Sequence, residues 1–119
     1  TFHFIKYFRK MKEIKAFVKP NRIQKVIEAL ADSGFQSMTL SQAEGTGAFK
    51  AKGAKPSLDF HVTDSPVVKL ELVCQNEEAQ DAIELIIANG KTNEQGDGII
   101  YVIDIENAFQ IKTGDSLKK

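Results

Sequence analysis

Residues 11–34 read MKEIKAFVKPNRIQKVIEALADSG, and two hydrophobic periodicities meet within this stretch. In its first part apolar and mostly polar residues alternate, which predicts a strand with one buried face formed by Ile14, Ala16 and Val18. In its second part apolar residues recur at the spacing of a core-facing helix: Ile23, Val26, Ile27 and Leu30. Pro20 suits the first turn of that helix and Gly34 its C-terminal end. The stretch therefore predicts a strand followed by a helix that packs on it.

The remainder of the chain gives the same order of elements again, without repeating the sequence. Alternation predicts strands at 37–44 and at 67–74, the latter with an apolar face of Val68, Leu70, Leu72 and Cys74. Between 76 and 90 we expect a helix that is capped by Asn76 and ends at Gly90, with an apolar stripe of Ala79, Ile83, Ile86 and Ile87. Residues 98–105, GIIYVIDI, form a nearly all-apolar strand, which is typical of a central place in a sheet.

This order of elements, strand-helix-strand twice, is that of the ferredoxin-like split βαβ arrangement. We therefore expect an α+β fold, βαββαβ, with an antiparallel sheet, two helices on one face and a long loop between the second and third strands. Phe17, Thr39 and Val73 fall on the sides of their strands opposite the helix-packing residues. We expect another subunit to cover this second face of the sheet, with the long loop as the alternative cover.

Composition limits the class of protein. The chain has 119 residues, of which 42% are hydrophobic and 27% charged, as in one soluble globular domain. It has no apolar run near the roughly 20 residues that a membrane-spanning helix needs. A single cysteine allows neither an internal disulfide nor the ligand spacing of a zinc site, which favours a reducing, cytoplasmic setting.

Charge is unevenly distributed along the chain, although 16 basic and 16 acidic residues give a net charge of zero. Residues 1–10, TFHFIKYFRK, hold three basic residues and no acidic one, so that 13 basic and 16 acidic residues follow from Met11 onward. We interpret 1–10 as a basic aromatic leader outside the fold, with an edge strand or an oligomer-contacting arm as alternatives. A single domain is expected at 11–115, with a short extra strand at 107–112 and a frayed tail at 116–119. The mildly acidic domain argues against nucleic-acid binding.

Residues 45–66 lack either periodicity and contain three glycines, two prolines and three lysines. An unpatterned stretch of about 20 residues is uncommon within a compact domain and is usually functional. We expect a long loop or a protruding hairpin here, with a partner-docking surface formed by Phe49, Lys50, Lys52 and Lys55. A solvated charged loop is the alternative.

Gly96, Asp97 and Gly98 precede the last strand. Glycines let backbone N–H groups turn toward an anion without obstruction by a side chain, which would suit a phosphate. A plain tight turn explains the same residues, because Asp-Gly is a common turn pair. If a phosphate binds here, Lys91 and Lys112 are the candidate cationic partners.

Gly45 and Gly47 mark the start of the long loop, either as a hinge or as backbone contacts for a phosphate. The hydroxyl of Thr39 could meet the edge of an adenine, or Thr39 could be simply a strand-favouring residue.

The sequence gives little evidence for a metal site or for a catalytic site. His61 lies near two aspartates without the spacing of a known metal site, and Cys74 stands on the apolar face of a strand. No set of residues with the context of a nucleophile and its base is present, so we expect no enzyme.

Five local strings, in order, resemble the PII signal-transduction proteins (nitrogen regulatory protein P-II). The first strand and helix of the family resemble MKEIKAFVKP and ALADSGF, and the third strand resembles VVKLELVC. The second strand with the base of the T-loop resembles SMTLSQAEGTG, and the far side of that loop resembles KGAKPSLDF. The B-loop and the C-terminal segment resemble NGK and GDG followed by IIYVIDIENAFQIKTGD. The resemblance covers residues 11–115.

The resemblance implies a homotrimer that binds an adenine nucleotide, ATP, ADP or AMP, in clefts between neighbouring subunits. Carried onto this sequence, the nucleotide-binding residues are Phe17, Thr39, Gly45, Gly47, Val73, Lys91, Gly96, Asp97, Gly98, Gln110 and Lys112. The resemblance also implies that the T-loop, within 45–66, docks on a target protein in a nucleotide-dependent way.

Several residues depart from the family pattern. Pro56 stands where nitrogen-regulating members carry a modifiable Tyr, and Phe49 stands where a Gln helps to hold Mg and 2-oxoglutarate. Ile99 replaces a Lys, and Gln110 and Lys112 replace two phosphate-binding Arg. The T-loop is about five residues shorter than usual, and TNEQ at 92–95 lengthens the B-loop. These departures argue against uridylylation at this position and against binding of Mg and 2-oxoglutarate, and they predict that ADP or AMP binds at least as well as ATP.

We therefore expect a divergent PII-like regulator of a transporter or an enzyme, in nitrogen or inorganic-nutrient regulation. Association with a membrane is expected only through a transporter. The alternative is a metal-tolerance protein, either of the similarly folded CutA type or a partner of a metal efflux system. A small enzyme that uses the same cleft is a third possibility.

Overall fold

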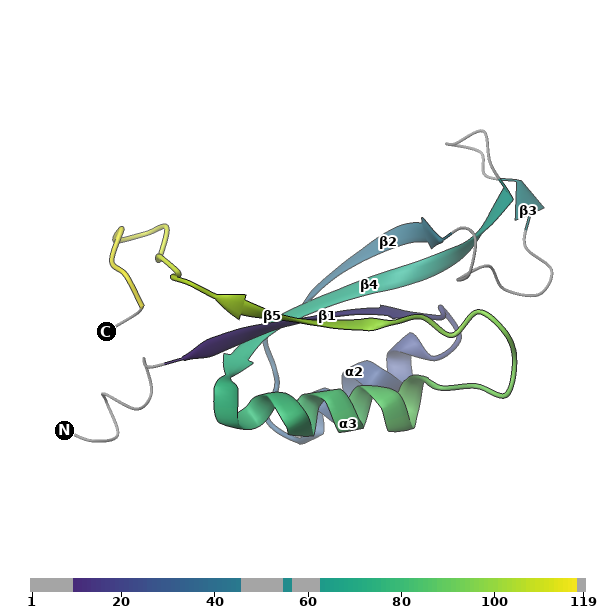
Figure 1. Cartoon of the computed structure of the whole chain (residues 1–119), viewed down its shortest axis with the longest axis horizontal. Coiled ribbons are helices and arrows are strands. Elements are labelled where there is room, and N and C mark those ends of the chain that lie inside the picture. Colours follow the sequence, from purple (N-terminus) through teal and green to yellow (C-terminus); the bar gives the residue numbers. More distant parts are fainter. Residues whose placement is uncertain (1–9, 46–54, 57–62, 118–119) are drawn as a thin grey trace.

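The computed structural model describes residues 10–45, 55–56 and 63–117. Its elements are β1 (Met11–Val18), α2 (Ile23–Asp32), β2 (Thr39–Gly45), β3 (Lys55–Pro56), β4 (Thr63–Gln75), the 3₁₀ turn η2 (Asn76–Glu78), α3 (Ala79–Gly90) and β5 (Ile100–Ile105). The main strands form an antiparallel sheet in the order β2-β4-β1-β5, and β3 pairs with β4 alone. Both helices lie on one face of this sheet, which confirms the ferredoxin-like α+β fold (Figure 1).

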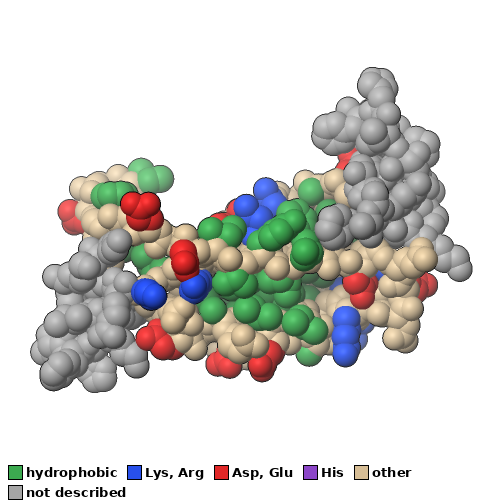
Figure 2. Space-filling model, in the orientation of Figure 1, with side chains coloured by type: hydrophobic (Ala, Val, Ile, Leu, Met, Phe, Trp, Pro, Cys, Tyr) green, Lys and Arg blue, Asp and Glu red, His purple; other side chains and the backbone are tan. Residues whose placement is uncertain are grey.

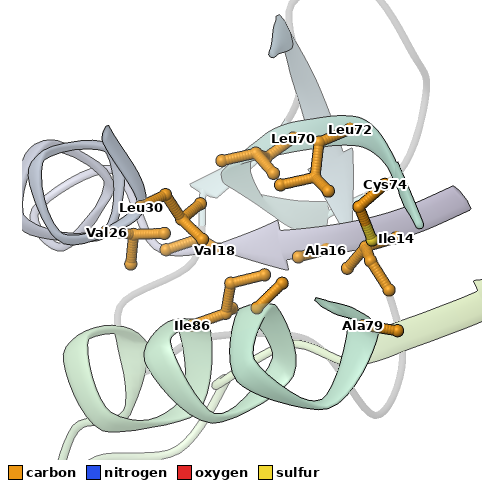
Figure 3. Close-up of a cluster of buried hydrophobic side chains, with 11 residues drawn as sticks. Ile14, Ala16, Val18, Val26, Leu30, Leu70, Leu72, Cys74, Ala79 and Ile86 are labelled. Carbon is orange, nitrogen blue, oxygen red and sulfur yellow. The ribbon is translucent and has the colours of Figure 1, made fainter. Parts of the chain in front are cut away.

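Strand β1 forms the centre of the core. Ile14 and Ala16 are fully buried and Val18 nearly so, because the alternation of β1 turns these side chains toward the helices. Val26 and Leu30 of α2 meet them from below, as the helical spacing predicts. The rest of the core comes from β4 and α3: Leu70, Leu72, Cys74, Ala79, Ala82 and Ile86 (Figure 3).

The start of α2 differs slightly from the expectation. The helix begins at Ile23, so that Pro20 lies in the preceding turn and not in the first helical turn. At the other end Gly34 has a φ of 98°, a left-handed conformation that glycine adopts without strain, and its N–H donates to the carbonyl of Ala31. Gly34 therefore ends the helix as predicted.

Two predicted features of the second helix differ from the structure: the residue that caps its start and the residues that it buries. Gln75 and not Asn76 stands at the N-cap position of η2, and its backbone N–H donates to the Glu78 carboxylate at 3.1 Å. Ile87 is half exposed, whereas Ala82 is fully buried. Ala82, which the predicted stripe did not include, therefore belongs to the core of the protein.

The prediction that residues 98–105 form a central strand is wrong. Strand β5 lies at the edge of the sheet, and Tyr101, Val102 and Ile103 are about 40 to 46% exposed. Its apolar composition therefore does not reflect burial within one chain. In Figure 2 hydrophobic side chains gather along the seam between β5 and α3, and the exposed residues of these two elements include Val102 and Ile87.

The C-terminal segment was also predicted incorrectly in part. No extra strand forms at 107–112 within the described part of the chain, where the pairing is a single bridge between Phe109 and Ser116. The N–H of Leu117 donates to the carbonyl of Ala108 at 2.7 Å. Leu117 and Ser116 thus bond to the segment that follows β5, and the frayed tail expected from residue 116 onward stays a prediction. Residues 118–119 lie outside the described residues, as do residues 1–9 of the expected leader.

The expected long loop is shorter than residues 45–66. Strand β2 continues to Gly45 and β4 begins at Thr63, and the short β3 pairs with the first residues of β4. The chain thus forms a hairpin beyond the end of the main sheet, in keeping with the protruding-hairpin alternative (Figure 1). Periodicity missed the start of β4, because Thr63, Asp64 and Pro66 break the apolar pattern.

Ile86 and Ile87 form a matched pair for testing the packing of α3, since they are 3% and 50% exposed. Ile86→Ala should lower the free energy of unfolding by about 2–5 kcal/mol, because it removes buried surface and leaves a cavity. Ile87→Ala should lower it by less than about 1 kcal/mol. Urea unfolding followed by circular dichroism, at equal protein concentration, measures both. Equal losses would contradict this orientation of α3.

Candidate functional site

The predicted nucleotide-binding residues divide between the two ends of the sheet. At one end β1 and β2 finish at Val18 and Gly45, beside the loop that connects α3 to β5 (residues 91–99, the α3–β5 loop) (Figure 1). At the opposite end the C-terminal segment leaves β5 and carries Gln110 and Lys112, both exposed. One protomer therefore does not bring all of the predicted residues together.

The sheet face opposite the helices, which we call the open face, carries most of the other candidates. The strand registers place on it Glu13, Lys15, Phe17, Thr39, Ser41, Val67, Lys69, Glu71, Val73, Tyr101 and Ile103. Val73 is 54% and Tyr101 45% exposed. An antiparallel sheet can keep one face in contact with water, but apolar residues this exposed indicate a surface that meets something else.

A cavity of about 310 Å³ lies at the loop end of the open face. It brings together three predicted site residues, Phe17, Gly45 and Gly98. Its other walls are largely apolar and include Val67, Ile99 and Tyr101. The rings of Phe17 and Tyr101 meet edge to face, with centroids 6.1 Å apart and planes at 88°. A flat apolar group would fit between these walls, next to the backbone of Gly45 and Gly98.

Thr39 and Val73 line a second, wider cavity of about 570 Å³ further along the same face. Glu71, which also lines the wider cavity, forms ion pairs with two lysines of the open face, Lys15 at 3.8 Å and Lys69 at 3.9 Å. The two cavities are therefore parts of one surface with an apolar end and a charged middle. Thr39 is exposed on the edge strand β2, where its hydroxyl is accessible.

Within the α3–β5 loop, Asp97 is held by side chains that the sequence did not single out. Thr92 donates from its backbone N–H to Asp97 Oδ2 at 2.7 Å and from its hydroxyl to Asp97 Oδ1 at 2.6 Å. Lys19, which follows β1 and is 9% exposed, lies 3.5 Å from Asp97 Oδ1 and donates to the Thr92 hydroxyl at 3.2 Å. Neither residue carries a motif, and only the fold brings residue 19 to the loop.

These contacts determine the charge state of Asp97. Burial raises the pKa of Asp97, but the hydrogen bonds from Thr92 and the charge of Lys19 outweigh it, and the pKa lies below its ordinary value. The contacts therefore stabilise the fold at neutral pH, and this contribution is lost as the pH falls through the folded-state pKa. The carboxylate of Asp97 is therefore bonded within the loop, and a nucleotide contact of this predicted site residue would fall to its backbone.

The backbone N–H groups of this loop are the feature on which an anion site would depend. Gly96 has a φ of 90°, which glycine adopts without strain. Among the described residues, no hydrogen bond from the backbone N–H groups of Gly96, Asp97 or Gly98 to another protein group is recorded. These N–H groups are free to meet an external acceptor.

Gly98 has a second role, because the backbone of β1 passes very close to it. A Cβ placed on Gly98 would lie 1.9 Å from the carbonyl oxygen of Phe17, where no side-chain atom fits. This approach lets the N–H of Phe17 donate to the carbonyl of Ile99 at 3.1 Å, which extends the pairing of β1 and β5 beyond Ile100. Packing alone thus requires glycine here, in addition to any contact with a phosphate.

Several predicted residues are not placed by the structure. Gly47, Phe49, Lys50 and Lys52 lie outside the described residues, and of Lys55 only the backbone in β3 is described. Lys91 directly follows α3 and is exposed at the start of the loop.

The features expected of a metal site are not found in the described part of the chain. It contains no group of three or more His, Cys, Asp or Glu residues that could hold a metal ion. Cys74 is buried in the core, and burial, with a smaller effect of Glu78, raises its pKa to about 11. It is therefore a thiol at neutral pH, which is a poor metal ligand. His61 lies outside the described residues. None of the helices described is long and apolar enough to cross a membrane.

Comparisons with known proteins agree with this architecture. The family model described as "Nitrogen regulatory protein P-II" matches residues 11–115. Nitrogen regulatory protein P-II of Pasteurella multocida is 36% identical over 110 residues, which cover 88% of this chain and 95% of that protein. The protein of the same name from Rhodospirillum rubrum is 39% identical with the same coverage. The crystal structure of Arabidopsis thaliana PII bound to citrate has a TM-score of 0.72, is 30% identical, and covers 91% of this chain and 89% of its own.

Gly98→Ala tests the close approach of the two strands. It should lower the free energy of unfolding by about 1–3 kcal/mol or more, because the added methyl group meets the rigid Phe17 backbone. Gly90→Ala is the matched control, since its added methyl would make only ordinary contacts, the nearest at 3.5 Å to Val26. Thermal unfolding of both variants measures the difference. A Gly98→Ala protein as stable as Gly90→Ala would contradict the approach.

Proposed function

Because the chain belongs to the P-II family of nitrogen regulatory signalling proteins, we propose that it binds an adenine nucleotide in the clefts of a homotrimer and thereby regulates a target protein. The single observation that carries the nucleotide site is the α3–β5 loop. Its Gly98, which has an unbonded N–H group, lines the cavity together with Phe17 and Gly45. Phosphate would meet the backbone of the loop, and the base would lie on the open face.

The division of the predicted residues between the two ends of the sheet supports a site shared between subunits. Gln110 and Lys112 can reach a nucleotide at the loop end only if a neighbouring copy supplies them. The open face and the exposed apolar residues of β5 and the C-terminal turn offer the surface for that contact: Tyr101, Ile103, Phe109 and Ile111. A closed homotrimer would cover them and complete three identical sites.

The walls of the cavity support ADP or AMP over ATP as the preferred ligand. Ile99 and Val67 offer no charge where a triphosphate would need cations, and Lys91 at the start of the loop does not line the cavity. Backbone N–H groups suffice for one or two phosphates, so the third would add repulsion without a matching contact.

The regulatory step belongs to the segment between β2 and β4. Nucleotide would favour one conformation of residues 45–66 over another and so permit or prevent docking on a target, a shift of population. The lysines at 50, 52 and 55 suit an acidic surface on that target. We place the protein in the cytoplasm as a regulator without enzymatic activity of its own, acting on a transporter or an enzyme of nitrogen or inorganic-nutrient metabolism.

Titration calorimetry with AMP, ADP and ATP tests the ligand. ADP or AMP should bind at least as tightly as ATP, because the cavity lacks cations for the third phosphate. Light scattering on the same sample should give three times the mass of one chain. Clearly tighter binding of ATP with Mg would contradict the proposed preference, and binding of no adenine nucleotide would contradict the proposed site.

The Ile99→Lys variant sharpens this test, since Ile99 is 39% exposed and lines the cavity. A new charge-assisted contact should raise the affinity for ATP about tenfold relative to AMP. The control is Lys25→Met, which changes one charge on the exposed side of α2. An unchanged ATP to AMP ratio in Ile99→Lys would place the phosphates elsewhere.

Docking is tested by reversing the loop charges together in Lys50→Glu, Lys52→Glu and Lys55→Glu. This triple variant should retain its ADP affinity but lose nucleotide-dependent capture of a protein from detergent-solubilised membranes or the soluble fraction. Lys25→Glu should retain both properties. Capture that is equal in the triple variant and the original chain would exclude these lysines as the docking surface.

A further inference from the structure

Lys19 is an unusual residue for its position, because a lysine that is 9% exposed loses most of its hydration and needs partners. The recorded partners of its amine both lie in the α3–β5 loop: the Thr92 hydroxyl at 3.2 Å and Asp97 Oδ1 at 3.5 Å. Lys19 follows β1 directly, so its backbone is anchored to the central strand of the sheet. The amine therefore ties the loop to the most rigid part of the fold.

Thr92 is the hub of these contacts. Its hydroxyl accepts from Lys19 and from the N–H of Glu94 at 3.1 Å, and it donates to Asp97. Its own N–H donates to the second oxygen of Asp97 at 2.7 Å. A bidentate bridge thus joins residues 92 and 97 and closes the intervening turn into a ring. Closing a turn in this way removes alternative conformations, a constraint that matters more as a loop becomes longer.

The same contacts would also favour the binding of an anion by the loop. A free Asp97 carboxylate beside the N–H groups of Gly96 and Gly98 would repel a phosphate, but Lys19 compensates its charge and Thr92 occupies its oxygens. Because Asp97 is bound through its side chain, its backbone and those of the flanking glycines keep their N–H groups available. Neither Lys19 nor Thr92 needs to touch the ligand to have this effect.

We propose that Lys19 and Thr92 are positioning residues, which hold Asp97 so that the α3–β5 loop keeps the one conformation that presents its backbone N–H groups to phosphate. The consequence for affinity rests on the proposed nucleotide binding, whereas the holding of the loop does not. If the loop takes this conformation in only a fraction of molecules, the apparent affinity for a phosphate ligand falls by that fraction.

The test compares Thr92→Val, which removes the hydroxyl at nearly constant shape, with Thr92→Ser, which keeps it. Amide hydrogen exchange of Thr92 and Glu94, whose N–H groups donate within the loop, should without ligand be about tenfold faster in Thr92→Val and close to the original rate in Thr92→Ser. Lys19→Met should behave like Thr92→Val, and Lys25→Met like the original chain. If Lys19→Met does not fold, the two Thr92 variants decide the matter.

The second measurement is the ADP affinity of the same variants by calorimetry. Thr92→Val should weaken ADP about tenfold, whereas Thr92→Ser should change it by less than about threefold. Exchange in Thr92→Val at the original rate would overturn the proposal, and so would faster exchange with unchanged ADP affinity. If the original chain binds no ADP, the proposed function fails, and hydrogen exchange alone then decides whether Lys19 and Thr92 hold the loop.

Discussion

Strand β1 is paired along both of its edges, with β4 on one side and β5 on the other, and the other parts of the molecule are arranged around this double pairing. Because successive side chains of β1 point to opposite faces of the sheet, Ile14, Ala16 and Val18 pack in the core against both helices. The residues between them face the open side of the sheet, where Phe17 reaches the cavity. One strand therefore fixes both the hydrophobic core and one wall of the candidate site.

The end of β1 shows how packing and function share the same residues. The backbone of Gly98 passes against the carbonyl of Phe17, and Lys19, two residues further on, holds Asp97 through its amine. The pattern Gly-Asp-Gly would be explained by strand packing and a closed turn even if no ligand bound there. The same packing leaves Gly98 in the lining of a cavity, so that a structural turn could also serve the proposed anion site.

Prediction from sequence succeeded where local periodicity and burial coincide and was wrong where an apolar residue is not buried within its own chain. The stripe of α2 and the alternation of β1 were predicted correctly, because each segment packs on the same core. Strand β5 reads as a central strand but lies at the edge, and Ile87 reads as a core residue but is half exposed. An apolar composition indicates that a surface is to be buried, but it does not indicate whether the same chain or another molecule buries it.

The sequence by itself determined the order of elements, the ferredoxin-like fold, the family and the glycines at the ends of the strands, since all of these follow from local pattern. Tertiary structure alone decided which residues meet. It brought Lys19 to Asp97 across 78 positions of sequence, bonded the Asp97 carboxylate within the loop, and placed the C-terminal segment after β5 at the far end of the sheet from the α3–β5 loop (Figure 1). The physical reason is that a contact between distant residues depends on strand order and register, which periodicity within one segment does not contain.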